Sequence, residues 1–543
     1  MQTLLGFFLA MSITIMLIWV LMRWAVPLGL IDLPSGRKVH SAPVPRVGGI
    51  AMVIGILVPL LLWGGSSPSD WALLGGILIL LIFGAWDDRK ALSWGPKFAG
   101  QALAVLVAML WGGVKVASVT LADRTPLPEW VALPLTFFFL LGGTNAFNLA
   151  DGLDGLAGGM AMLCLSGTAL MAFTVGTPVV GGAAIIMVGA IIGFLRFNTY
   201  PAQVFMGDAG SQTLGYCAAV LAVLLTQDAQ APLSTALPLL LLGLPIIDTL
   251  MVMVARLLAR ESPFVADRRH IHHRLLAIGF EHWEAVSILY LLQTGLFVAA
   301  WFMRYASDLA VTAVFVAFAV AVLLTIHLVQ RFGLRVRAMP ARYRDAAVAV
   351  SARGPDAALH SAARAVLAGV LVLCGAGVVR YGAKPSVDLG VMAAVLAVAL
   401  LLGLLLRRHQ AEISWVDRLA LYSSAALAIY LGGQNLPPSP YPSLLECSVF
   451  PLLAVAAVVC IRTARDRPFR ITPLDVMVLL LVITVPNLPD SAAYARTMGL
   501  RLAELVLLLY AVEALSFAVR GHWHWLSGAA ATFLLGLVLR SIW

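Results

Sequence analysis

Residues 131–159 read VALPLTFFFLLGGTNAFNLADGLDGLAGG, an apolar run that ends in evenly spaced polar side chains. The apolar part is long enough to cross the roughly 30 Å of hydrocarbon in a bilayer. Residues three apart are neighbours on a helix face, so a polar ladder is predicted at the end of this membrane helix: Asn145, Asn148, Asp151 and Asp154. Gly152 and the glycines after it favour a break where the backbone can approach a ligand. Because carboxylates in a membrane are costly and usually functional, we interpret the ladder as part of a site, with a purely structural ladder as the alternative.

Similar apolar runs extend over the whole chain of 543 residues. Hydrophobic residues make up 61% of it and charged residues 12%, which excludes a soluble globular protein. We therefore predict an all-α polytopic membrane protein with about 11 transmembrane helices before residue 340. The runs cover residues 3–30, 48–64, 71–86, 98–112, 131–149, 156–176, 181–197, 209–226, 232–254, 285–303 and 309–330.

A polar segment separates this part from a second set of apolar runs, which adds about 5 to 7 helices. These runs lie near residues 363–381, 388–406, 418–433, 447–461, 474–486, 501–519 and 525–539. We predict three parts: a membrane-embedded module at 1–335, a cytoplasmic polar linker at 336–362 and a C-terminal transmembrane extension at 363–543. The extension could dock another membrane protein, handle lipid or form a fused transport-like domain, and no motif in it decides among these.

The positions of lysine and arginine predict the orientation in the membrane. They concentrate in alternate loops, at residues 31–47, 87–97, 255–284 and 331–362, which are therefore expected in the cytoplasm, with the N-terminus outside. Retention of these loops explains the net charge of +9, and basic residues dispersed in this way do not indicate a nucleic-acid partner. The same helix count places residues 145–159 and 205–211 at the cytoplasmic face as well.

Two further acidic segments fall on that face. Asp87 and Asp88 end an apolar run and precede Lys97; adjacent acids suit metal binding or proton abstraction, with a charge cluster at a helix end as the alternative. The segment FMGDAGS, residues 205–211, places Asp208 between glycines at a loop-to-helix junction. Such a loop can present Asp208 to a hard cation, and the helix N-terminus after it can face an anion.

Two basic segments complete the set. The first is a compact cluster of Arg268, Arg269, His270, His272, His273 and Arg274. Its histidines could bind zinc or belong to a structural loop, but the arginines would repel a cation, so diphosphate binding is the better interpretation. A second, weaker patch precedes Gly48: Arg37, Lys38, His40 and Arg46. Acids and bases from five segments thus predict one site for metal and phosphate.

In this order the five segments resemble the motifs of the polyprenyl-phosphate N-acetylhexosamine-1-phosphate transferase family. They are RKVH at 37–40 with PRVGG at 45–49, DD at 87–88 with Lys97, NAFNLADGLDG at 145–155, FMGDAGS at 205–211 and HIHH at 270–273. The resemblance covers about residues 1–335. The HIHH form is closer to the branch that starts O-antigen, enterobacterial common antigen or teichoic acid linkage synthesis than to the peptidoglycan translocase branch, which has three adjacent histidines.

The resemblance implies transfer of an N-acetylamino-sugar 1-phosphate from a UDP-sugar to undecaprenyl phosphate, with release of UMP, at the cytoplasmic face of a bacterial inner membrane. It implies Mg²⁺ as cofactor, with Mn²⁺ as a substitute, bound by Asn148 and Asp208. The catalytic residues it implies are Asp87, which would deprotonate or orient the acceptor phosphate, with Asp88, Lys97, Asp151 and Asp154. The substrate-binding residues it implies are Arg37, Lys38, His40, Arg46, Asn145, Arg269, His270, His272 and His273.

Two other classes of function are open to such a sequence, a secondary transporter and a lipid-linked glycosyltransferase that releases UDP. Transporter sites lie near the membrane midplane within broken helices. The helix count instead places the acids at helix ends on one face, which favours the enzyme. Direct displacement is favoured over a covalent intermediate, because the acceptor phosphate is already a nucleophile. The sugar, the glycan pathway and a homodimeric state are not assigned by these residues.

Overall fold

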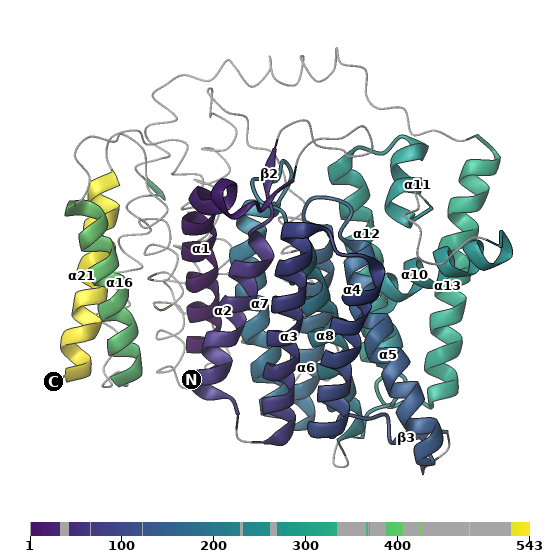
Figure 1. The fold of residues 1–543 in the computed structure, drawn as a ribbon. Coiled ribbons are helices and arrows are strands. Elements are labelled where there is room, and N and C mark those ends of the chain that lie inside the picture. The colour runs from purple at the N-terminus through teal and green to yellow at the C-terminus, as the bar shows by residue number, and fades with distance from the viewer. Residues whose placement is uncertain are drawn as a thin grey trace. The chain divides into compact units, whose positions relative to one another are not determined.

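The computed structural model describes residues 2–32, 43–65, 67–121, 123–228, 232–260, 269–333, 387–405 and 523–542, with a few isolated positions besides. The chain divides into two compact units. The first comprises Met1–Ala338 with Thr472–Leu481, and the second comprises Met339–Ile471 with Val482–Trp543. Figure 1 shows the first unit as a bundle of helices joined by short connections.

Each of the eleven predicted runs in the first unit forms helix. Ten of them are α1 (Gln2–Leu28), α2 (Gly48–Trp63), α3 (Pro68–Lys90), α4 (Trp94–Leu106) with the π-helix η1 (Val107–Trp111), α5 (Glu129–Ala150), α6 (Leu156–Val175), α7 (Pro178–Asn198), α8 (Gly207–Gln227), α12 (His282–Phe302) and α13 (Asp308–Arg331). In the part of the chain that the structure describes, eight helices are long and apolar enough to cross a membrane. This confirms the all-α polytopic class, whereas α2, α4 and the run at 232–254 form shorter helices.

The run at 232–254 was predicted as one helix and is instead broken into α9 (Pro238–Leu241) and α10 (Gly243–Leu258). The break is stabilised by Gln293 of α12, which is fully buried. Its Nε2 donates to the Leu241 carbonyl over 2.8 Å, and its Oε1 accepts from the Leu244 N–H over 3.1 Å. Backbone groups freed inside a membrane protein need such internal partners. As a result α10 lies across the other helices rather than along them (Figure 1).

Local sequence signals explain where several helices begin. Ser67 and Asp70 form a capping box at the start of α3, with Pro68 at the first helical position. The Ser307 side chain accepts the Ala310 N–H at the start of α13. Gly155, with φ of +80°, separates α5 from α6, in the turn that the sequence predicted as a break.

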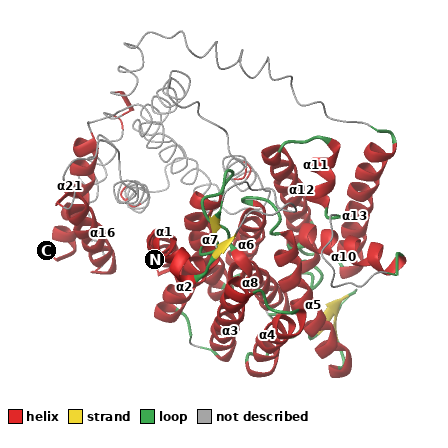
Figure 2. Ribbon diagram, turned by 45° about the horizontal axis from the view of Figure 1, so that its top comes forward, coloured by secondary structure: helices red, strands yellow, loops and turns green. Residues whose placement is uncertain are grey.

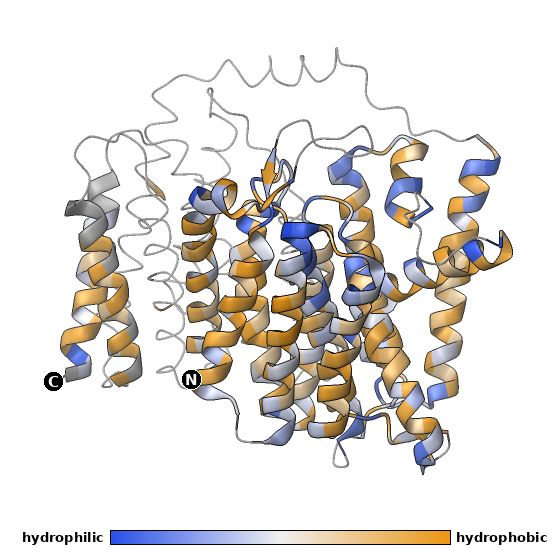
Figure 3. Cartoon of the chain, in the orientation of Figure 1, coloured by the Kyte–Doolittle hydropathy of each residue, from blue (hydrophilic) through white to orange (hydrophobic). Residues whose placement is uncertain are grey.

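Helix α8 forms the centre of the first unit, because it packs against α2, α3, α5 and α6 and is almost completely buried. Helix α13, by contrast, is mostly exposed, as expected for a helix that faces lipid. Figure 3 shows apolar residues along the middle of the helices and hydrophilic residues at the upper ends of α3 and α13.

Two short strand pairs lie at opposite ends of the helices (Figures 1 and 2). Strands β1 (Ile31–Asp32) and β2 (Val44–Pro45) are antiparallel, as are β3 (Ser118–Thr120) and β4 (Arg124–Pro126). A short helix that the hydropathy pattern did not predict follows α10, namely α11 (Ile271–Ile278).

In the second unit, α16 (Val387–Leu405) packs against α21 (Trp523–Ile542). The two helices correspond to the predicted runs at 388–406 and 525–539. Gly390 allows the close approach, because a Cβ atom there would lie 1.9 Å from the Ser541 Oγ. The other five predicted runs of the extension lie outside the described residues.

Candidate active site

The N-terminus of α8 is where the predicted segments meet. Asp88, at the end of α3, accepts the Asp208 N–H with Oδ1 over 2.8 Å and the Ala209 N–H with Oδ2 over 3.2 Å. Asp88 is buried and caps α8 from a neighbouring helix. Asp88 thereby holds the backbone of Asp208 in place, and the catalytic role predicted for Asp88 stays a prediction. Two of the N–H groups at this helix N-terminus, which was predicted to face an anion, thus already have a carboxylate partner.

Two glycines permit this contact between α3 and α8. A Cβ atom on Gly84 would lie 2.4 Å from the Ala209 Cα, so the two backbones touch one helical turn before Asp88. Gly207 has φ of +68°, and a Cβ atom there would lie 2.5 Å from both carboxylate oxygens of Asp88. Glycine is therefore required at the first residue of α8 both for its backbone conformation and for space.

Lys97 of α4 joins the carboxylates of Asp87 and Asp208. Its Nζ donates to the Asp87 Oδ2 over 3.2 Å and forms an ion pair with the Asp208 Oδ2. The other oxygen of Asp87 accepts the Leu92 N–H over 2.6 Å. The side chains of Asp87 and Asp208 are 13% and 19% exposed, so both can be reached from the surface. A shared ammonium between two accessible carboxylates is an arrangement that suits phosphate chemistry.

Helix α5 contributes the amides of the predicted ladder. The Asn148 Nδ2 donates to the Asp208 Oδ1 and to the Ser211 Oγ, each over 2.9 Å. One turn earlier, the Asn145 Oδ1 accepts from the Gln101 Nε2 at 3.5 Å, and Gln101 follows Lys97 by one turn of α4. The facing sides of α4 and α5 are thus both polar next to Asp208.

The acids of the ladder lie beyond the helix, because α5 ends at Ala150. Asp151 is at the helix end and half-buried; this burial, and then the nearby charges of Asp208, Asp88 and Asp154, raise its pKa to about 7. The Asp154 Oδ2 accepts the Ala202 N–H over 3.0 Å, which ties the turn to the segment before FMGDAGS. Asp151 and Asp154 therefore belong to the same cluster as Asp208 but occupy the connecting turn.

The first basic patch reaches the site through backbone hydrogen bonds. The Gly48 and Gly49 N–H groups donate to the Phe205 and Met206 carbonyls, each over 3.0 Å. Arg46, which is partly exposed, forms an ion pair with Asp32. The predicted residues Arg37, Lys38 and His40 lie outside the described residues.

The histidine cluster lies at the start of α11. The His270 Nδ1 is 2.9 Å from the Asp248 Oδ2, and the imidazole rings of His270, His272 and His273 follow one another in stacked or tilted contact. His272 is buried, and its Nε2 would lie 2.3 Å from a Cβ atom on Gly152. Burial, and then the neighbouring His273, lower the pKa of His272 to about 3. His272 thus packs between α11 and the acidic turn, and its predicted part in diphosphate binding stays a prediction.

Known proteins match this chain over the part that carries the site. The sequence profile of glycosyl transferase family 4 matches residues 71–226. A probable undecaprenyl-phosphate N-acetylglucosaminyl 1-phosphate transferase of Bacillus subtilis is 36% identical over 289 residues, which cover 52% of this chain and 80% of that protein. The chain belongs to glycosyl transferase family 4.

Other relatives agree with this membership. An undecaprenyl-phosphate alpha-N-acetylglucosaminyl 1-phosphate transferase of Yersinia pestis is 30% identical over 280 residues, 50% of this chain and 76% of that protein. A decaprenyl-phosphate N-acetylglucosaminephosphotransferase of Mycolicibacterium smegmatis is 34% identical over 301 residues, 49% of this chain and 73% of that protein. The family 4 chain is thus a transferase among multi-pass bacterial membrane proteins, as the five motifs predicted.

The structure also places in the site four residues that were not among the predicted site residues. Gln212 donates to the Asp208 Oδ2 over 3.2 Å from the next turn of α8. Ser211 and Gln101 extend the polar surroundings of Asp208 and Asn145, and Asp248 contacts His270. Ser211 closes the FMGDAGS motif, and helical spacing from Asp208 and Lys97 could have indicated Gln212 and Gln101. Nothing in the sequence marks Asp248.

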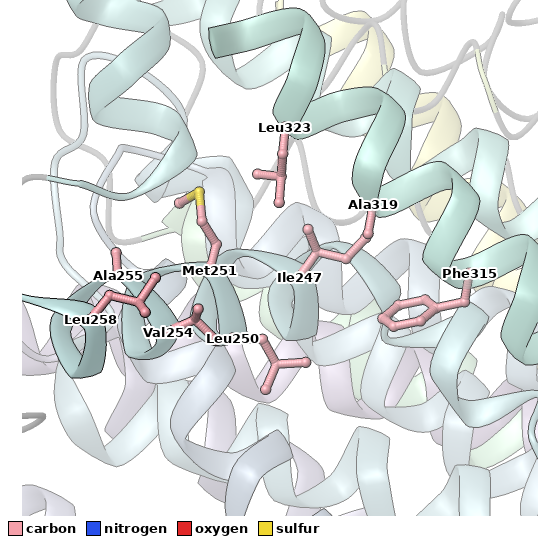
Figure 4. A pocket seen from close by; sticks show the side chains of 9 residues that line it. All are labelled: Ile247, Leu250, Met251, Val254, Ala255, Leu258, Phe315, Ala319 and Leu323. Carbon is pink, nitrogen blue, oxygen red and sulfur yellow. The ribbon is translucent and has the colours of Figure 1, made fainter.

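An apolar pocket of about 340 Å³ lies between α10 and α13. Ile247, Leu250, Met251, Val254, Ala255 and Leu258 line it from α10, and Phe315, Ala319 and Leu323 line it from α13 (Figure 4). Ile247 precedes Asp248 in sequence, so the helix that lines the pocket also reaches the histidine cluster.

Proposed function

We propose that the chain transfers an N-acetylamino-sugar 1-phosphate from a UDP-sugar to undecaprenyl phosphate at the cytoplasmic face of the membrane, releases UMP and starts lipid-linked glycan synthesis. The names of the relatives support a polyprenyl-phosphate acceptor and transfer of a sugar phosphate. The observation that carries the proposal is the pair of accessible carboxylates, Asp87 and Asp208, that share the Lys97 ammonium. Motif segments far apart in the sequence surround this pair.

The proposed reaction is a direct displacement. An oxygen of the acceptor phosphate attacks the β-phosphorus of the UDP-sugar, the bond from that phosphorus to the bridging oxygen breaks, and UMP leaves. Asp87 orients or deprotonates the acceptor phosphate, next to Lys97. Arg269, His270 and His273 hold the diphosphate, whose negative charge suits this cluster.

Magnesium is the proposed cofactor, with Mn²⁺ as a substitute. Among the residues that the structure describes, no group of three or more His, Cys, Asp or Glu side chains could hold a metal alone. Mg²⁺ does not need such a group, because it binds through one or two carboxylates together with waters and substrate phosphates. The side chains of the site fit this pattern, because the carboxylates of Asp87 and Asp208 already share one cation, the Lys97 ammonium. We propose that Asp208 and Asn148 hold the ion, which when bound would neutralise charge on the transferred phosphate.

The pocket between α10 and α13 is proposed to hold part of the isoprenoid chain of the acceptor. All nine of its lining residues are apolar, and α13 is largely exposed at the surface of the unit. An apolar chain in this pocket would lie along the same helix that supports His270 through Asp248.

The purified full chain, supplied with undecaprenyl phosphate, Mg²⁺ and UDP-N-acetylglucosamine or related UDP-sugars, tests the proposal. We expect UMP in equal amount to a new lipid diphosphate sugar. UDP as the released nucleotide would show a different glycosyltransferase, and absence of any nucleotide with every donor tried would overturn the proposal.

A matched pair of lysine variants makes this assay specific. Lys97 and Lys115 each lie 3.2 Å from a carboxylate oxygen, of Asp87 and Glu129 respectively, but only Lys97 is in the site. Lys97→Met should lower UMP release by on the order of a hundredfold, comparable to the loss of a main electrostatic contributor. Lys115→Met should keep the activity of the unchanged protein.

A further inference from the structure

Asp248 is a buried acid on α10 that belongs to none of the five motif segments. Its Oδ1 accepts the Ile271 N–H over 2.7 Å, and its Oδ2 lies 2.9 Å from the His270 Nδ1. Ile271 is the first residue of α11. One carboxylate therefore holds both the start of this helix and the first histidine of the cluster.

The contact determines which nitrogen of His270 carries the proton. A carboxylate can only accept, so Nδ1 must donate its hydrogen to Asp248. Nε2 is then the nitrogen left to interact with a substrate or exchange a proton, as in other histidines whose ring is oriented by a carboxylate.

The break before α10 explains how Asp248 reaches this place. Gln293 holds the chain at Leu241 and Leu244, and Asp248 follows on α10 within hydrogen-bonding distance of the first residue of α11. The arrangement repeats the one at α8, where Asp88 reaches from another helix to backbone N–H groups beside Asp208. In both cases a buried acid from outside the helix accepts backbone N–H groups of its first turn.

We propose that Asp248 is a positioning residue for the transfer reaction, which sets the tautomer and orientation of His270 toward the diphosphate of the nucleotide sugar. The proposal rests on the proposed function. Asp248 acts through His270 and does not itself touch the substrate.

Asp248→Asn separates the two contacts of this side chain. The amide oxygen can still accept the Ile271 N–H, so α11 keeps its cap. The amide nitrogen donates, so the neighbouring His270 Nδ1 must become an acceptor and the proton moves to Nε2. We expect kcat for UMP release to fall about 10- to 100-fold, the cost typical of losing the outer partner of a functional histidine. Thermal unfolding should change little.

Asp308→Asn is the matched control. Asp308 is as buried as Asp248 and accepts from the Ser234 Oγ over 2.6 Å and the Ala236 N–H over 3.0 Å, but it lies at the start of α13, away from the cluster. This variant should lose thermal stability and keep kcat within twofold. An equal fall in kcat for both variants would show a general effect of a buried amide and overturn the proposal.

A double-variant cycle identifies the partner through which Asp248 acts. In a His270→Gln background, Asp248→Asn should lower kcat by less than twofold, because the group that it orients is already absent. Losses that multiply, or a kcat within twofold of the unchanged protein for Asp248→Asn alone, would contradict the proposal. If Asp248→Asn does not fold, Asp248→Glu should retain more activity than Asp248→Gln. Equal activities of these two variants would refute the role proposed for Asp248. Absence of UMP release by the unchanged protein would instead refute the proposed function.

Discussion

Gly207→Ala tests the contact on which the candidate site depends. The new methyl group would lie 2.5 Å from both carboxylate oxygens of Asp88, at a backbone φ of +68°. Alanine in the left-handed region costs about 1–2 kcal/mol. Asp88 must also move, which leaves the Asp208 and Ala209 N–H groups without their acceptor, and loss of such a cap costs about 1 kcal/mol. The sum, about 2–3 kcal/mol, is smaller than the stability of an ordinary folded domain, about 5–15 kcal/mol.

The expected result is a folded protein with a displaced Asp208. Because a misplacement of about 1 Å can lower a rate by about 100-fold, UMP release should fall by about that factor. Gly142→Ala on α5 is the control, since a Cβ atom there meets nothing within 4 Å. Alanine is favoured over glycine inside a helix by up to about 1 kcal/mol, so this variant should be equally or more stable and fully active.

The assay measures UMP release and thermal unfolding for both variants at equal protein concentration. Normal turnover of Gly207→Ala would refute the argument, because it would mean that the position of Asp208 does not depend on the capped start of α8. Loss of activity together with complete unfolding would show that the contact is structural for the whole unit.

Three further predictions concern the metal, the orientation and the pH response. Asp208→Asn should lower turnover by about a hundredfold and change its dependence on Mg²⁺ concentration; unchanged dependence would exclude Asp208 as a ligand. Single cysteines at Ser93 and Ser67 should react with impermeant reagents from opposite sides, Ser93 from the cytoplasm, and labelling from the same side would overturn the helix count. His272 has a pKa of about 3 in the folded protein, so the unfolded chain binds more protons below pH 6.5 and stability falls as pH falls. This effect reaches about 2 kcal/mol at pH 5, and His272→Gln should reduce the acid-induced drop in melting temperature; an identical drop would contradict it.

Much of the helical fold could be predicted from the sequence because hydropathy depends on runs of neighbouring residues. The run at 131–149 and helix α5, Glu129–Ala150, differ by two residues at the start and one at the end. The glycines after Asp151 correctly predicted the break that follows, since Gly155 adopts a positive φ. The order of the motifs and the alternation of basic loops also predicted that segments far apart in the sequence meet. The hydrogen bonds from the Gly48 N–H to the Phe205 carbonyl and from the Asp208 N–H to the Asp88 carboxylate are such contacts.

The break between α9 and α10 could not be predicted in this way. The residues on both sides are apolar, and the stabilising group, Gln293, follows some fifty residues later on another helix. The role of Asp248 was missed for the same reason, because it depends on where the break directs α10. His272 was predicted to help bind the diphosphate with its neighbours, and its burial against Gly152 could not be predicted from the sequence.

The acids of the site differ in the groups that their oxygens contact. This difference separates the acids that position other residues from the acids that can take part in the reaction. Both oxygens of Asp88 accept backbone N–H groups, and Asp248 accepts one N–H group and holds a histidine. Asp88 and Asp248 are each 7% exposed, and protein partners already contact the oxygens of both carboxylates. Asp87 and Asp208 are more exposed, and the oxygens that they direct at each other share a lysine side chain that can move. A phosphate can compete with the two carboxylates for that ammonium, whereas replacing Asp88 as the acceptor of the Asp208 and Ala209 N–H groups would disturb the start of α8. We therefore expect Asp87 to be the reactive acid of the adjacent pair, whereas its neighbour Asp88 holds Asp208 through the backbone.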